Sequence, residues 1–167
     1  QYSQDGQKIA FLSYRSGTSE IWICDSSGSN LVQLTSYGGP EISWLRWSPD
    51  RKRIAFSAVS NGQDDIFWIS AQGGKPQRLT DHAAHDSGPT WSRDGRWVYF
   101  RSNRTGQFQV WRMPADGGGE AVQVTKLGGG RASESQDGQW LYYSRSEFDS
   151  SLWRVPTGGG QEQQVLD

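Results

Sequence analysis

The sequence predicts an all-β fold made of four repeats of a small antiparallel sheet, and three observations support this prediction. A turn pattern, Ser-x-Asp followed by Gly or Arg, recurs at intervals of roughly 44 residues. Short segments rich in β-branched and aromatic residues follow every copy at matching distances. Gly contributes 21 of the 167 residues, and no stretch of about 12 residues keeps a helical apolar period, so turns and short strands are favoured over helices.

The repeated turn sets the register of the chain. Its four copies are Ser3–Gly6, Ser48–Arg51, Ser92–Gly95 and Ser135–Gly138. A short Asp side chain can hydrogen-bond to its own backbone two residues on and so stabilise a turn. Because this Asp recurs four times, it is interpreted as an Asx-turn residue and not as a catalytic acid. The residues concerned are Asp5, Asp50, Asp94 and Asp137.

Three strands are expected after each turn. The first set is Ile9–Ser13, Ile54–Ala58, Val98–Ser102 and Leu141–Arg145. The second set is Ile21–Cys24, Ile66–Ile69, Val110–Met113 and Leu152–Val155. The third, closing set is Val32–Thr35, Gln77–Thr80, Val122–Thr125 and Gln163–Leu166. A fourth, inner strand precedes the later turns. It is expected at Ser43–Trp47, Gly88–Trp91 and, more weakly, Arg131–Glu134, where Glu134 replaces the Trp of the other two.

The strand Ile21–Cys24 indicates how the sheets pack. Ile21 and Ile23 lie on one side, and Trp22 and Cys24 on the other, so both sides are apolar. A small sheet with two apolar faces must pack between neighbours, and radial stacking of four-stranded meanders gives a β-propeller. We therefore predict propeller blades at approximately residues 1–42, 43–86, 87–130 and 131–167, with the first blade lacking its inner strand.

An arc of four blades leaves the outer faces of its end blades exposed. Propellers have roughly 4–8 blades, and large apolar patches are usually covered. We expect the chain, which begins at Gln1, to be an excised part of a larger ring or to self-associate. Two copies about a two-fold axis would complete an eight-bladed ring. A closed ring of four blades is the alternative.

The repeat resembles that of TolB-type propellers. The resemblance rests on Trp47-Ser-Pro-Asp50, then Ile54-Ala-Phe56, Asp65-Ile66 and Leu79-Thr80, and it extends over essentially the whole chain. Arg51, where the pattern has Gly, and Glu134 depart from it. The resemblance implies a non-catalytic module for protein interaction or sensing. The same repeat occurs in the propellers of tricorn-type and prolyl-oligopeptidase-type peptidases, which makes a gating propeller of a peptidase the alternative. A self-contained propeller enzyme or lectin-type binder is a third hypothesis.

Composition excludes several other classes. The net charge is −1 without a cluster of Lys or Arg, which argues against a nucleic-acid partner. The longest apolar runs are far shorter than a membrane span, so no membrane insertion is expected. No signal peptide is indicated, and both the bacterial periplasm and the cytoplasm stay open as compartments. The single cysteine, Cys24, aligns with apolar residues of the other repeats and is interpreted as a buried hydrophobe.

Candidate binding residues come from two sets of loops that open on one rim of a propeller. These loops connect the outer strand to the next inner strand, and the second strand to the third. The first set nominates Glu41, His82, His85, Arg131 and Glu134. The second set nominates Arg15, Arg104 and Asp149. Because Arg15 and Arg104 recur at one repeat position, they are also read as structural ties of their loops.

The remaining motifs are interpreted as structural. His82 and His85 with flanking carboxylates could bind a metal, but no third ligand is indicated, so solvated or capping histidines are the favoured interpretation. The Gly-rich runs lack the Lys-Ser/Thr of a phosphate loop and are expected to be turns. Trp22, Trp111 and Trp153 share one repeat column, which indicates packing. No catalytic residue, metal or cofactor is predicted.

Overall fold

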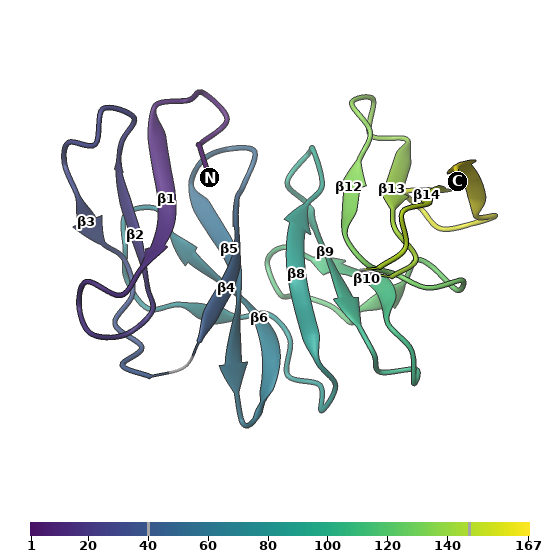
Figure 1. The fold of residues 1–167 in the computed structure, drawn as a ribbon, viewed down its shortest axis with the longest axis horizontal. Helices are drawn as coiled ribbons and strands as arrows, with labels where there is room; N and C mark the ends of the chain where they lie inside the picture. Colours follow the sequence, from purple (N-terminus) through teal and green to yellow (C-terminus); the bar gives the residue numbers. More distant parts are fainter. Residues whose placement is uncertain (40, 147) are drawn as a thin grey trace.

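The computed structural model describes residues 1–39, 41–146 and 148–167, and it consists of four antiparallel sheets (Figure 1). The first sheet contains β1 (Lys8–Ser13), β2 (Glu20–Asp25) and β3 (Val32–Gln33). The second contains β4 (Ile42–Trp47), β5 (Arg53–Ser60), β6 (Gln63–Ser70) and β7 (Gln77–Arg78). The third contains β8 (Asp86–Trp91), β9 (Trp97–Ser102), β10 (Gln109–Pro114) and β11 (Val122–Gln123). The fourth contains β12 (Ala132–Glu134), β13 (Trp140–Tyr143), β14 (Leu152–Pro156) and β15 (Gln163–Leu166).

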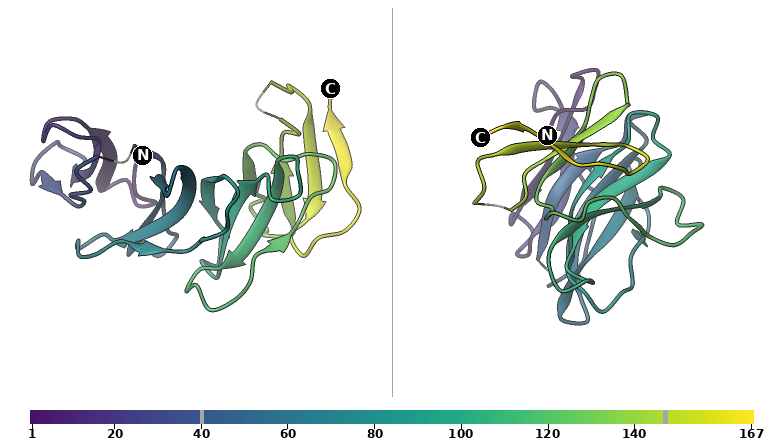
Figure 2. Two further views of the ribbon diagram at one scale, coloured as in Figure 1. Left: turned by 90° about the horizontal axis from the view of Figure 1, so that it is seen from below. Right: turned by 90° about the vertical axis from the view of Figure 1, so that its right-hand side faces the viewer.

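The sheets follow one another along a curved arc (Figure 2). Within each sheet the strands pair in chain order, so each sheet is an antiparallel meander. The first sheet has three strands, and Tyr2 forms an isolated bridge to Ile9 at its inner edge. The predicted all-β blades, with an incomplete first blade, are therefore confirmed. The described ranges contain no helical residue, and thus no helix that could cross a membrane.

The apolar core lies in layers between consecutive sheets. One cluster joins Ile21 of β2 to Ile54 and Phe56 of β5. A second cluster begins on the opposite face of β5 with Ala55 and continues into the third sheet. A third cluster lies between the last two sheets and includes Tyr99 and Tyr143. Because successive residues of one strand enter different clusters, each inner sheet is buried on both faces, as the apolar alternation predicts.

The repeated turns are held by a recurring hydrogen-bond pattern, seen clearly at Ser92–Gly95. The Ser92 hydroxyl donates to Asp94 Oδ1 at 2.7 Å, and Asp94 Oδ1 accepts from the Arg96 amide at 3.0 Å. The Ser92 hydroxyl also accepts from the Trp97 amide at 2.9 Å, which anchors the first residue of β9. The other three turns repeat these contacts. The Asx-turn interpretation of the four Asp residues is confirmed.

In each of the first three sheets, a buried threonine ties the outer strand to the strand beside it. The Thr35 hydroxyl accepts from the Ile21 amide at 2.8 Å and donates to Glu20 at 2.6 Å. Thr80 and Thr125 make the same two contacts with the equivalent residues of their sheets. Burial raises the pKa of Glu20, but hydrogen bonds led by Thr35 outweigh burial and leave that pKa below its ordinary value.

Arginine–tryptophan pairs cross each later sheet between its second and third strands. In the second sheet, Arg53 of β5 stacks over Trp68 of β6 at 5.3 Å. In the third and fourth sheets the residue types are exchanged. There an Arg of the third strand stacks over a Trp of the second strand, at 4.5 Å for Arg112–Trp97 and 4.2 Å for Arg154–Trp140. These cation–π contacts form the same cross-strand pair with its partners reversed.

Candidate functional site

Two sets of loops meet at one end of the sheets, which is called the loop rim below. It contains residues 36–39, 41, 81–85 and 126–131, which precede inner strands, and residues 14–19, 61–62, 103–108, 144–146 and 148–151. Hydrogen bonds join the two sets. The His85 amide donates to Asn103 Oδ1 at 3.0 Å, and Arg145 Nε donates to the Leu127 carbonyl at 2.7 Å. The opposite end, which carries the Ser-x-Asp turns, is called the turn rim.

The predicted residues of the first loop set lie apart from one another. Glu41 is exposed beside β4. His82 accepts from the Ala84 amide through Nδ1 at 3.0 Å, which makes it a cap of its own turn. The His85 Nδ1 atom lies 3.8 Å from an Asp64 carboxylate oxygen, and both side chains are solvent-accessible. Within the described ranges, no three His, Cys, Asp or Glu residues gather as a metal site would require.

The predicted arginines of the second loop set are tied to their own sheets. Arg15 stacks over Trp22 at 5.0 Å, and Arg104 stacks over Trp111 at 4.7 Å. Arg104 also pairs with the fully buried Asp86 at 2.7 Å, and only 13% of its side chain is exposed. These contacts are those of a structural tie. Asp149 accepts a hydrogen bond from the Ser151 amide at 2.9 Å, so its side chain stabilises its own loop.

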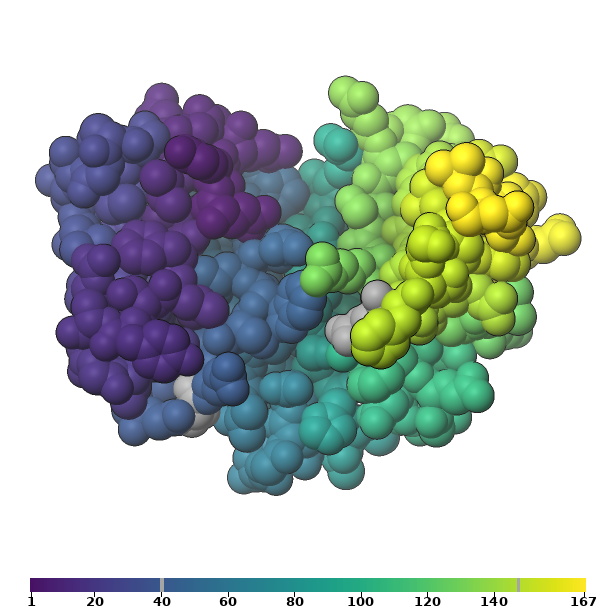
Figure 3. Space-filling view, in the orientation of Figure 1, coloured from purple at the N-terminus to yellow at the C-terminus, as the bar shows by residue number. Residues whose placement is uncertain are grey.

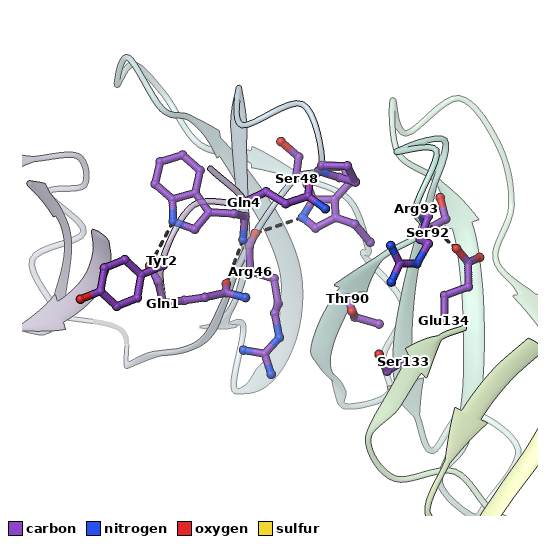
Figure 4. Close-up of a pocket in the computed structure, with 13 residues that line it drawn as sticks. Gln1, Tyr2, Gln4, Arg46, Ser48, Thr90, Ser92, Arg93, Ser133 and Glu134 are labelled. Atoms are coloured by element: carbon purple, nitrogen blue, oxygen red, sulfur yellow. Dashed lines mark hydrogen bonds between the residues drawn. The ribbon is translucent and has the colours of Figure 1, made fainter. Parts of the chain in front are cut away.

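Glu134 lies at the turn rim and not on the loop rim, where it was expected. It ends β12, next to the Ser135–Gly138 turn, and Figure 4 shows it turned towards Arg93. Its carboxylate accepts from the Arg93 amide at 2.6 Å and from the Tyr99 hydroxyl at 2.9 Å. Burial, followed by this contact, raises the pKa of Tyr99. Glu134 therefore joins the third and fourth sheets.

The indole groups at the equivalent position also make contacts between sheets. Trp47 donates to the Gln1 carbonyl at 3.2 Å, and Trp91 donates to the Arg46 carbonyl at 3.0 Å. Each bond reaches the innermost segment of the preceding sheet. Glu134 therefore joins neighbouring sheets as Trp47 and Trp91 do, but its carboxylate accepts hydrogen bonds where the indole groups donate them.

The inner strands β4, β8 and β12 line the concave side of the arc, which is called the inner face below, and Arg131 lies there just before β12. Its guanidinium carbon is 4.7 Å from the ring centroid of Trp44, which belongs to β4 of the second sheet. Arg46, two residues further along β4, lines the adjoining pocket, which has a volume of about 230 Å³ and is shown in Figure 4. Burial, and then the charge of Arg131, lowers the pKa of Arg46. Two cationic groups from different sheets therefore share the inner face.

A groove of about 560 Å³ opens on the loop rim beside the fourth sheet. Leu127 and Phe148 provide apolar surface along it, and Arg145 lies beside them. Phe148 is 97% exposed and Leu127 is 47% exposed. In Figure 3 the yellow-green part of the chain bends from the last sheet towards the middle of the molecular face that is seen in this view.

The run Gly128–Gly130 forms the floor of this groove. A Cβ atom on Gly129 would lie 2.2 Å from the Val110 nitrogen, so only glycine permits this close approach of the two backbones. Gly128 has a φ of 112°, and its amide donates to Gln109 Oε1 at 3.1 Å. This run is therefore more than the simple turn that its composition predicts, because it packs directly on β10.

Sequence reasoning missed Trp44, Arg46, Leu127 and Phe148 as site residues. A signal for two of them exists in the repeat alignment. Trp44 stands where the other inner strands have Gly88 and Arg131, and Arg46 stands where they have Thr90 and Ser133. Positions that differ between repeats are the better functional candidates. Phe148 could have been found as an isolated aromatic residue in a polar loop.

Comparisons with known proteins agree with this architecture. The sequence profile of the TolB beta propeller domain matches residues 1–166. An uncharacterized protein of Agrobacterium fabrum is 34% identical over 137 residues, which is 82% of this chain and 43% of that protein. The Tol-Pal system protein TolB of Anaeromyxobacter dehalogenans is 39% identical over 91 residues, covering 52% of this chain and 20% of its own length.

Solved structures show the same fold. One from Agrobacterium tumefaciens has a TM-score of 0.83 at 26% identity, over 99% of this chain and 63% of its own. TolB from Acinetobacter baumannii has a TM-score of 0.82 at 23% identity, over 99% of this chain and 42% of its own. The chain therefore spans less than two thirds of each of these relatives. From its profile match and its repeated four-stranded sheets, the chain belongs to the TolB beta-propeller family.

Proposed function

We propose that the chain is a non-catalytic propeller module that binds a protein partner through its loop rim. The observation that supports this most strongly is Phe148, an aromatic side chain with 97% of its surface exposed. Aromatic residues are enriched among the few side chains that dominate protein–protein binding energies. Leu127 and the groove beside it extend the apolar surface that a partner would cover.

The Leu127 side of the groove is preformed. Gly129 packs against the β10 backbone, and Arg145 holds the Leu127 carbonyl from the neighbouring loop. The Glu162 carboxylate also accepts from the amides of Lys126 and Leu127, at 2.7 and 3.2 Å. A groove wall fixed in this way loses little conformational entropy on binding, which favours affinity for a partner that covers Leu127 and Phe148 together.

A photo-crosslinking experiment tests this proposal. The variant Phe148→p-benzoylphenylalanine is expected to crosslink one defined protein in cells, and the partner so identified is then titrated against purified protein. Phe148→Ala should weaken that binding by roughly 10- to 100-fold. Leu31→Ala is the matched control, because Leu31 is exposed but lies between β2 and β3 on the turn rim. Equal losses for the two alanine variants, or no crosslink at position 148, would contradict the proposal.

A second candidate function is the propeller part of a peptidase. It is favoured by one relative, the uncharacterized peptidase YuxL of Bacillus subtilis, which is 33% identical over 105 residues. That match covers 59% of this chain and 16% of the relative. A fluorophosphonate serine-hydrolase probe applied to the natural full-length protein discriminates the two functions. Labelling supports the peptidase, and an unlabelled protein refutes it.

We also propose that copies of the chain associate with one another. Every residue of β15 is exposed, so the fourth sheet ends in an open edge strand, of which Val165 and Leu166 are apolar and 40% and 62% exposed. Sedimentation equilibrium at micromolar concentration should give a mass above that of one chain. A monomeric mass would reject self-association without affecting the partner proposal.

A further inference from the structure

Trp44 stands at a backbone position that favours glycine. The pairing of β4 with β5 shifts between Ser43 and Arg46, and Trp44 in this bulge has a φ of 59°. The pairing of β8 with β9 shifts at the equivalent place, where Gly88 has a φ of 65°. A bulky aromatic residue in the left-handed region is strained. Such strain is concentrated at functional sites, where a side chain must point in a particular direction.

The Trp44 side chain lies beside two arginines, Arg46 and Arg131. Arg131 stacks over Trp44 at 4.7 Å, although the two residues belong to the fourth and second sheets. Arg46 Nη1 donates to the Leu45 carbonyl at 2.8 Å. Among residues 1–39, 41–146 and 148–167, no Asp or Glu forms an ion pair with Arg46 or Arg131. Glu134 also lines the pocket of about 230 Å³ that Arg46 borders, but its carboxylate accepts hydrogen bonds from the Arg93 amide and the Tyr99 hydroxyl and forms no ion pair with either arginine.

The space beside these arginines suits a small anionic group. A cavity of about 30 Å³, comparable to the volume of one water molecule, lies among Trp44, Arg46 and Arg131. Arg46 and Thr90 also line the larger pocket of about 230 Å³, which Figure 4 shows, so the two spaces adjoin at these two residues. A carboxylate oxygen could occupy the smaller cavity while the segment that carries it occupies the larger one.

We propose that Trp44, Arg46 and Arg131 bind a carboxylate of an acidic segment of a protein partner at the inner face of the arc. The guanidinium fork matches the two oxygens of a carboxylate, and stacking on Trp44 fixes the plane of the Arg131 fork. A nucleic acid is disfavoured because the whole chain has a net charge of −1 and the positive charge is local. This inference rests on the proposed partner-binding function and specifies the chemistry of the partner.

The test uses two peptides as probes, acetyl-tetraglutamate amide and acetyl-tetraglutamine amide, in isothermal titration calorimetry. The glutamate peptide is expected to bind, more weakly as salt is added, and the glutamine peptide at least about tenfold more weakly. Arg131→Gln should reduce glutamate-peptide binding at least about tenfold. Arg96→Gln is the matched control, because it removes the same charge from a side chain that is 79% exposed on the turn rim.

Trp44→Gly separates a binding role from a structural one. Glycine relieves the left-handed strain, so the melting temperature should stay within a few degrees while peptide binding falls at least about tenfold. Trp44→Asn is the second variant, since Asn also tolerates this conformation. If both folded variants bind the glutamate peptide like the wild type, the inference is wrong.

Other outcomes also overturn the inference. Equal binding of the two peptides, or equal losses for Arg131→Gln and Arg96→Gln, would remove its basis. Displacement of the glutamate peptide by an equal concentration of inorganic phosphate would indicate a general anion site and refute the acidic segment. If position 148 captures a partner while the wild type does not bind the glutamate peptide, only this inference fails and the proposed function stands.

Discussion

Replacing Thr35 by valine tests the buried contact that ties β3 to β2. Valine matches threonine in shape, so the change removes the hydroxyl without opening a cavity. The Ile21 amide, at a residue with no exposed surface, loses its acceptor, and Glu20 loses one charge-assisted hydrogen bond. A stranded buried amide costs about 1–3 kcal/mol, and a hydrogen bond to a charged group contributes about 1.5–3 kcal/mol. We expect Thr35→Val to lower the free energy of unfolding by about 3 kcal/mol.

Thermal unfolding followed by circular dichroism measures this effect. A loss of about 3 kcal/mol corresponds to a decrease in melting temperature of roughly 6–12 °C for a chain of this length. Thr18→Val is the control, because Thr18 donates to the same carboxylate at 2.9 Å but accepts no buried amide there. It should cost about 1.5 kcal/mol, the lower end of the range for a hydrogen bond to a charged group, because this hydrogen bond is only partly buried. Equal decreases for the two variants would refute the reasoning, because they would show that the stranded Ile21 amide contributes nothing.

Two further predictions concern the turn rim. The hydrogen bond from Ser3 lowers the pKa of Asp5 to about 2, and that from Ser92 lowers the pKa of Asp94 to about 2. A carboxyl group whose pKa is lower in the folded state than its unfolded value near 4 stabilises the fold at pH values above 4. This stability is lost as the pH falls from 4 towards 2, so the urea midpoint should decline over that range. The decline should be less steep in Asp94→Asn. Arg51 has a φ of 63° and pairs with Asp5. Arg51→Gly should leave stability in urea unchanged or up to about 1 kcal/mol higher, and a loss above about 1 kcal/mol would contradict this.

The internal repeats of the sequence explain why so much of the fold could be predicted. Each strand and turn occurs several times, so a single ambiguous segment is identified by its counterparts. The Ser92–Gly95 turn, for example, shows the same hydrogen bonds as its three relatives because the same short side chains recur. The burial of Cys24 also follows from its repeat column. These features depend on local spacing, which the sequence displays directly.

The candidate site was harder to predict because its contacts connect different sheets. Arg131 and Trp44 are separated by the whole third sheet in sequence, and no periodic pattern links them. Glu134 was assigned to the wrong rim because its loop was considered instead of its place in the strand. Its alignment with Trp47 and Trp91, which end their strands, would have placed it beside the turn. Phe148 follows no repeat column, so only its exposure identifies it.

The exchanged arginine–tryptophan pairs set a rule for recombining these repeats. Joining β5 to β10 in a chimeric sheet would make Arg53 and Arg112 diagonal neighbours, and joining β9 to β6 would do the same for Trp97 and Trp68. The first combination places like charges together, and the second must fit two indoles into a space for one. The unit that can be moved between blades is therefore the hairpin with both of its strands. A library that shuffles whole hairpins should yield more folded propellers than one that shuffles single strands.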